Sequence, residues 1–126
     1  MSELSFHIET AKLLNAYARQ DTLHFHVPNG EKRDPRTAAR LKQMGVRAGV
    51  ADFTIIVNGG VHFLELKTSK GRLSTDQIVF SEDAERAGAS FHVAHSLDDV
   101  IDTLNRIGAL RVVLNRACGG RETQSS

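Results

Sequence analysis

The chain has 126 residues, of which 40% are hydrophobic and 25% charged, with one cysteine and a formal net charge of +1. These values are typical of a single globular domain with a core of its own, and they exclude an intrachain disulfide. No apolar run approaches the roughly 20 residues of a membrane span, no secretory signal is visible, and no Cys and His residues have zinc-ligand spacing, so we expect a cytoplasmic protein.

Residues 3–19 are predicted to form an amphipathic helix. Its apolar stripe is formed by residues at helical spacing: Leu4, Ile8, Ala11, Leu14 and Ala18. Glu3 and His7 fall beside this stripe, one turn apart. Because a carboxylate next to a buried stripe needs a partner or a metal, Glu3 is a candidate site residue. The alternative is an acid at the start of the helix, favoured only by the helix dipole.

Residues 23–27 alternate in polarity and predict a strand, on which His24 and His26 share one face. We expect these imidazoles on the solvated side of an edge strand rather than against DNA. A short helix follows, with Asp34 as N-cap, Pro35 at its first position and Gly45 at its end.

The segment 45–51 is rich in glycine and small residues and leads into Asp52. It indicates either a close approach of the backbone to another group, such as a phosphate, or a flexible connector.

Asp52 and Glu65 are placed by a predicted hairpin. Residues 53–57 and 61–67 read as strands joined through Asn58-Gly59-Gly60, a tight-turn sequence, so Asp52 should lie opposite residue 65 or 66. Glu65 and Lys67 project to the same face of their strand. Paired carboxylates favour a divalent cation, and a lysine beside them completes the groups needed to cut a phosphodiester with a metal-activated water. The alternative is a solvated Glu–Lys pair.

Ser74 and Gln77 are spaced as a capping box before a helix at 75–87, which by itself explains Gln77 structurally. A strand at 90–94 and a helix at 97–107 follow. Residues 111–114 are either an extra strand or a dimer contact, and 116–126 are expected to be a disordered tail after a single domain at 1–115. The order αβαββαβα predicts an α/β fold, a central mixed sheet flanked by helices.

Charge is unevenly distributed along the chain despite the small net value. Cations dominate residues 31–47 and acids dominate residues 76–102. The basic segment indicates a phosphate-binding face, or alternatively a solvated helix surface.

Together these residues resemble the PD-(D/E)XK nuclease superfamily, and more specifically the VRR-NUC family in its small stand-alone form found in phages and bacteria. The resemblance covers about residues 3–108. It is carried by Pro28-Asn29-Gly30, the segment 41–50, Asp52, Leu64-Glu65-Leu66-Lys67, Gly71-Arg72-Leu73-Ser74 and Gln77. Ala51 stands where the family usually has proline before the metal-binding Asp. That proline shapes the loop and is not a ligand.

The resemblance implies a restriction-endonuclease-like fold and Mg²⁺- or Mn²⁺-dependent cleavage of DNA in a bacterial cell or phage-infected host. Asp52, Glu65 and the backbone carbonyl of Leu66 would hold the metal, with Glu3 as a further ligand. Lys67 would position or deprotonate the attacking water or stabilise charge on the phosphate, and Gln77 would support it. Phosphate contacts would come from basic side chains that do not read sequence: Arg33, Arg36, Arg40, Lys42 and Arg47.

Three functions remain open from the sequence. The first is a metal-dependent endonuclease, with selectivity for branched or flapped DNA as one option. Paired cuts on a junction would then require a homodimer. The second is a non-catalytic DNA-binding module that retains the nuclease fold. The third is an unrelated hydrolase of small phosphoesters, for which the basic segment is less suited.

Overall fold

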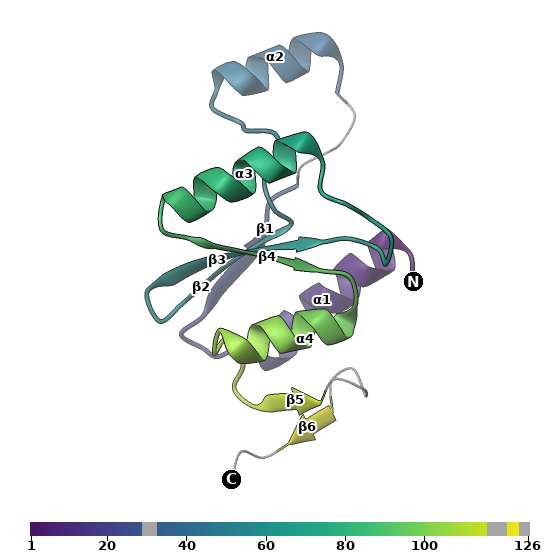
Figure 1. Cartoon of the computed structure of the whole chain (residues 1–126), viewed down its shortest axis with the longest axis vertical. Helices are drawn as coiled ribbons and strands as arrows, with labels where there is room; N and C mark the ends of the chain where they lie inside the picture. Colours follow the sequence, from purple (N-terminus) through teal and green to yellow (C-terminus); the bar gives the residue numbers. More distant parts are fainter. Residues whose placement is uncertain (29–32, 116–120, 124–126) are drawn as a thin grey trace.

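The computed structural model describes residues 1–28, 33–115 and 121–123. Helices and strands are interspersed along the chain (Figure 1). In order, they are α1 (Glu3–Tyr17), β1 (Leu23–His26), α2 (Pro35–Gln43), β2 (Phe53–Val57), β3 (Gly60–Leu66), α3 (Thr75–Arg86), β4 (Ser90–Ala94), α4 (Leu97–Arg106), β5 (Val113–Asn115) and β6 (Arg121–Thr123). The predicted order and the α/β class are confirmed, and the ends of the predicted helices and strands differ from these bounds by no more than two residues.

A mixed sheet in the order β1-β2-β3-β4 forms the centre of the molecule. The first two pairings are antiparallel, and β3 pairs with β4 in parallel, as the intervening helix α3 predicts. Helices α1 and α4 lie on one face of the sheet and α3 on the other (Figure 1). The expected sheet flanked by helices is therefore present.

The β2–β3 hairpin has the predicted register. Val57 pairs with Gly60 across a two-residue turn, and Phe53 pairs with Leu64. Asn58 and Gly59 adopt φ values of 52° and 76°, the left-handed conformations of the turn type that matches strand twist. Continuing this register by one residue sets Asp52 opposite Glu65.

The larger core lies between the sheet and helices α1 and α4. It contains Leu14, Ile55, Leu64, Ile101 and Leu104, all fully buried. A smaller cluster on the opposite face packs α3 onto the sheet. It consists of Ala51, Phe80 and Ala84, with Phe63 and Phe91 against them.

The predicted apolar stripe of α1 is correct only in part. Leu14 is buried and Ala11 packs against the core. Leu4 and Ile8 are instead 70% and 43% exposed, and the helix also buries Phe6, Thr10 and Leu13. Thr10 tolerates burial because its hydroxyl donates to the carbonyl of Phe6 at 2.9 Å. With this polar group satisfied inside the helix, the face that contains Thr10 can turn toward the sheet.

Helix α2 stands apart from the sheet, beyond α3 (Figure 1). Its start is as predicted: the Asp34 carboxylate accepts from the Thr37 amide at 2.8 Å, and Pro35 is the first helical residue. No residue of α2 is buried, and Met44 at its C-cap is 72% exposed. The expected apolar side of this helix, formed by Ala38, Leu41 and Met44, therefore has no core to pack on within the described residues.

The C-terminal part adds a small two-stranded sheet. Val113 to Asn115 pair with Arg121 to Thr123, which lie inside the segment expected to be a tail. Residues 116–120 and 124–126 of that segment lie outside the described residues. Among the described residues, no helix is long and apolar enough to cross a membrane.

Candidate active site

Asp52 lies immediately before β2 and is held at both its backbone and its side chain. Its carboxylate oxygen Oδ2 accepts a hydrogen bond from the backbone amide of Leu66 at 2.8 Å. Its carbonyl oxygen lies 2.6 Å from Nδ1 of His26. The Asp52 carboxylate thus accepts the hydrogen bond that a neighbouring strand would accept at the end of β3. This bond fixes the carboxylate beside Glu65.

Glu65 is a buried carboxylate, with 4% of its surface exposed. Its Oε2 accepts from Nε2 of Gln77 at 3.1 Å and lies 3.7 Å from Nζ of Lys67. Burial, and then the neighbouring charge of Asp52, raise the pKa of Glu65 from its usual 4.5 to about 7, while Lys67 opposes this shift. The site therefore combines two carboxylates that repel each other with one ammonium group that compensates only part of the charge.

Gln77 caps α3, as expected, and its side chain also contacts Glu65. Its side-chain oxygen accepts from the Ser74 amide at 2.8 Å, and the Ser74 hydroxyl accepts from the Gln77 amide at 3.2 Å, which completes the capping box. Its side-chain nitrogen remains free to donate to Glu65. The capping geometry thus holds the amide in the orientation that reaches the carboxylate.

The glycine-rich segment before Asp52 packs against the first turn of α3. A Cβ on Gly49 would lie 2.3 Å from the carbonyl oxygen of Asp76 and 2.8 Å from the amide nitrogen of Gln77, and Gly49 has a φ of 80°. The expected close backbone approach is present, and the partner in this structure is the backbone of α3. The contact ties the segment carrying Asp52 to the helix carrying Gln77.

Asp52, Glu65 and Gln77 line an open cavity of about 740 Å³. Its chemically active lining residues are Glu3, His7, His26, Asp52, Glu65, Lys67 and Gln77. Glu3 is exposed at the cavity wall. Among the described residues, it is not part of the group of possible metal ligands that converge closely.

The donor set fits a divalent cation. Asp52 and Glu65 present carboxylate oxygens to the same cavity, and Mg²⁺ and Mn²⁺ accept such oxygens together with several waters. Burial, and then the charge of Asp52, raise the pKa of Glu65, so Lys67 compensates the negative charge of the site only in part. A cation at this position would compensate the remainder.

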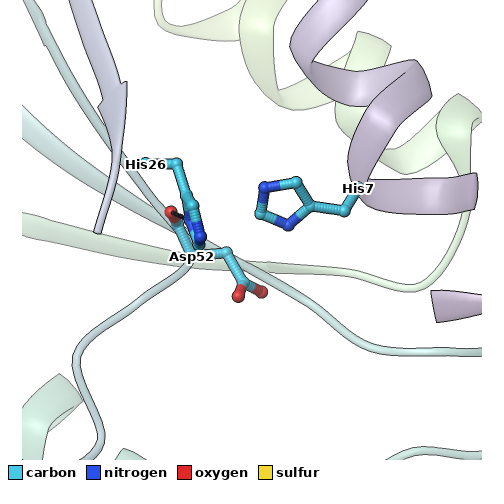
Figure 2. A group of neighbouring side chains, drawn as sticks. All are labelled: His7, His26 and Asp52. Atoms are coloured by element: carbon cyan, nitrogen blue, oxygen red, sulfur yellow. Dashed lines mark hydrogen bonds between the residues drawn. The ribbon is translucent and has the colours of Figure 1, made fainter. Parts of the chain in front are cut away.

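His7 and His26 were not identified as site residues from the sequence. His26 is exposed on the edge strand β1, as expected. Its ring also lies beside that of His7, with centroids 4.2 Å apart, and both approach Asp52. The three residues belong to α1, β1 and the segment before β2 (Figure 2). No short sequence spacing could reveal a cluster assembled from such distant segments.

The predicted phosphate contacts lie outside this cavity. Arg33, Arg36, Arg40 and Lys42 are exposed on α2 or just before it. Arg47 instead pairs with Asp83 at 2.5 Å, with its guanidinium 5.4 Å from the centre of the Phe80 ring. Both partners of Arg47 belong to α3, so this side chain holds the glycine-rich segment to that helix.

A second hollow, of about 560 Å³, lies beside α2 and is lined by Arg33, Lys42, Arg47 and Asp76 among others. Asp76 immediately precedes Gln77 at the start of α3. The basic hollow and the carboxylate cavity therefore adjoin at the first turn of one helix.

Two solved structures are similar to this chain in fold. One, described as a VRR_NUC domain protein, is 24% identical with a TM-score of 0.61, covering 79% of this chain and 84% of the other. A second, described as a VRR_NUC domain, is 20% identical with a TM-score of 0.55, covering 82% of this chain and 94% of the other. The chain has the VRR_NUC fold. No family model matches the sequence, and no curated protein matches it.

The VRR_NUC likeness extends over most of both chains in each comparison. The resemblance noted in the sequence is confirmed at the level of fold. At these identities it leaves the chemistry to be argued from the side chains themselves.

Proposed function

We propose that this protein is a divalent-metal-dependent nuclease that hydrolyses phosphodiester bonds of DNA. The observation that carries the proposal is the pair of half-buried Asp52 and buried Glu65, which lies beside Lys67 and Gln77 on one open cavity. The VRR_NUC fold supports it, since the two similar structures are described as VRR_NUC domains.

Asp52 and Glu65 would hold the cation, which when bound supplies a Lewis acid for the phosphate and an activated water. The Leu66 carbonyl is proposed as a third ligand. Within a strand, the N–H and C=O of one residue point to the same side, and the Leu66 N–H points to Asp52. Glu3 is proposed to complete the ligand set from the cavity wall, through water because it stands outside the converging group.

Lys67 is proposed to act on the attacking water or on the charge that develops on the phosphate. Its ammonium lies 3.7 Å from Glu65 in the cavity, and its side chain is 18% exposed, so it can reach a substrate at the mouth. Gln77 orients Glu65 through its side-chain amide. These residues act from rigid positions, a strand end and a capped helix start, which favours catalysis by preorganised groups.

The DNA backbone would lie across the basic hollow beside α2. Arg33 and Lys42 line the hollow, and Arg36 and Arg40 are exposed elsewhere on α2. The hollow is lined by Asp76 and the cavity by the next residue, Gln77. Arg47 retains a phosphate role in this proposal only if it exchanges its pairing with Asp83. Contacts of this kind position the duplex without reading its sequence.

Finer features of the proposal concern the substrate and the assembly. We propose selectivity for branched, flapped or junction DNA, Mg²⁺ or Mn²⁺ as the cofactor, and action in the cytoplasm of a bacterial or phage-infected cell. Because each chain has one carboxylate cavity of this composition among the described residues, paired cuts across a junction would require a homodimer.

The test is cleavage of linear duplex, flap and four-way junction DNA with Mg²⁺ or Mn²⁺ and with chelator. The unaltered protein should cut only when metal is present. Lys67→Ala should lower the rate by about a hundredfold or more while DNA binding persists. Lys70→Ala is the matched control, because Lys70 is exposed and does not line the cavity.

Two outcomes would overturn the proposal. Equal cleavage by the Lys67→Ala variant would refute the role of that lysine. DNA binding without cleavage by the unaltered protein, together with no Mn²⁺ binding by calorimetry, would favour a non-catalytic DNA-binding module.

A further inference from the structure

Three potential metal ligands converge in the cavity, and two of them come from elements that the carboxylate site does not use. They are His7 of α1, His26 of β1 and Asp52. One ligand atom from each lies within 4.8 Å of the other two. The side chains point toward one another in Figure 2, with the His7 ring facing the gap between His26 and the Asp52 carboxylate.

The hydrogen bond of His26 determines which ring nitrogen is available. Its Nδ1 lies 2.6 Å from the carbonyl oxygen of Asp52. A carbonyl can only accept, so Nδ1 carries the proton, and in the neutral ring Nε2 keeps a lone pair. Metal-bound histidines usually donate their other ring N–H to such an oxygen, which fixes the tautomer and the orientation of the ring.

His7 is also held in a fixed orientation. Its ring stacks on Phe53 with centroids 4.7 Å apart and an angle of 30° between the planes, and it meets the edge of the His26 ring. This packing fixes the ring at the position from which it faces His26 and Asp52.

We propose that His7, His26 and Asp52 form a binding site for a divalent transition ion such as Zn²⁺ or Co²⁺, distinct from the oxygen-ligand position between Asp52 and Glu65. Two imidazoles and one carboxylate suit these ions, whereas Mg²⁺ prefers oxygen ligands. Asp52 is shared by both positions, so an ion bound by the histidines lies next to the carboxylate pair.

This inference does not rest on the proposed nuclease activity. The site is defined by the ligands and by the His26 hydrogen bond, and it can be tested on protein without DNA. If nuclease activity is present, the site adds a preference for transition ions to a cavity that otherwise offers oxygen ligands.

The first experiment titrates metal-free protein with Co²⁺, followed by calorimetry and by the visible absorption of the cobalt ion. His7→Ala and His26→Ala should each weaken Co²⁺ binding by at least about tenfold, since removing even an outer partner of a ligand has an effect of that size. His24→Asn is the matched control, because His24 is on the same strand and outside the cluster. It should bind Co²⁺ like the unaltered protein.

Glu65→Gln separates the two positions. This substitution should weaken Mg²⁺ binding. The visible absorption spectrum of bound Co²⁺ should still be that of an ion with nitrogen ligands. Unchanged Co²⁺ affinity in both folded histidine variants, or an equal loss in His24→Asn, would overturn the proposal.

A measurement on the unaltered protein covers the case in which a variant does not fold. Nitrogen NMR of the imidazoles should show His26 as the Nδ1–H tautomer in metal-free protein. Added Zn²⁺ should then shift the ring signals of His7 and His26, leaving those of His24 and His95 in place. The opposite tautomer, or Zn²⁺ shifts at other histidines only, would refute the site. Cleavage assays play no part in either readout, so failure here is distinguishable from failure of the nuclease proposal.

Discussion

Gln77 combines helix capping and contact with a carboxylate in one side chain. Its oxygen belongs to the capping box with Ser74, and its nitrogen donates to Glu65. Removing either member of the box costs a similar amount of helix stability, but only Gln77 touches Glu65. This pair therefore separates the two roles.

Gln77→Ala and Ser74→Ala should each lower the free energy of unfolding by about 1 kcal/mol through the cap. Only Gln77→Ala should also lower DNA cleavage, by roughly tenfold, because it removes a hydrogen bond to a charged group. Urea unfolding and initial cleavage rates measure the two effects. Equal loss of activity in both variants would mean that Gln77 acts only through the helix.

Glu65 makes the protein sensitive to pH. Its folded pKa of about 7 lies above its usual 4.5, so the folded state binds this proton more tightly than the unfolded state. The stability contributed by the protonated form is fully present below pH 4.5 and is lost as pH rises toward and through 7. Urea midpoints of metal-free protein should therefore fall over this range.

Metal binding should show the reverse dependence, because the cation competes with that proton. Mg²⁺ affinity should rise with pH up to about 7, by no more than about tenfold per pH unit, and then level off. In Glu65→Gln, the urea midpoint of metal-free protein should no longer fall as pH rises from 4.5 to 7. A profile that keeps its slope in this variant would assign the effect to another group.

At the scale of elements, the contact between the glycine-rich segment and α3 positions the two halves of the carboxylate site. Gly49 and Gly45 both have positive φ, at 80° and 100°, but only Gly49 touches α3. A Cβ at Gly45 would meet nothing within 4 Å. These two glycines therefore distinguish backbone strain from a steric clash.

Gly45→Ala should cost about 1 kcal/mol, the penalty of the left-handed conformation for a residue with a Cβ. Gly49→Ala carries that penalty and an overpacking cost of about 1–3 kcal/mol more, and it should also reduce cleavage because α3 must move. Thermal unfolding and cleavage rates test both variants. Similar effects from the two substitutions would show that the close approach is unimportant.

At the scale of the whole molecule, the basic side chains are gathered on a helix that the fold does not need for its core. Helix α2 buries none of its residues, and Arg36 and Arg40 are exposed on it. Such a helix can present cations to a polymer without affecting the sheet. Its substitutions should therefore separate DNA binding from folding.

Arg36→Ala with Arg40→Ala should weaken DNA binding equally across sequences and reduce the slope of log affinity against log salt by about 2. Unfolding should be unchanged. Lys12→Ala, a cation on α1 that pairs with Glu9, is the control and should leave the slope intact. Titrations of labelled duplex at several salt concentrations measure the slope, and an unchanged slope in the double variant would place the DNA elsewhere.

Local sequence determined most of the fold and the carboxylate side of the cavity. Asn58-Gly59 specified the hairpin turn, which set Asp52 opposite Glu65, and strand alternation placed Lys67 beside Glu65. The α3 capping box and the order of helices and strands were likewise visible, because caps, turns and side-chain periodicity depend on neighbours only a few residues apart.

Tertiary packing decided what the sequence left ambiguous. The buried face of α1 was predicted only in part, since a threonine can satisfy its hydroxyl within the helix and turn inward while Leu4 stays exposed. That rotation and the antiparallel pairing of β1 with β2 bring His7 and His26 to Asp52. The carboxylate pair could be predicted because a hairpin joins its members. The histidine cluster could not, because its members meet only when separate elements pack together.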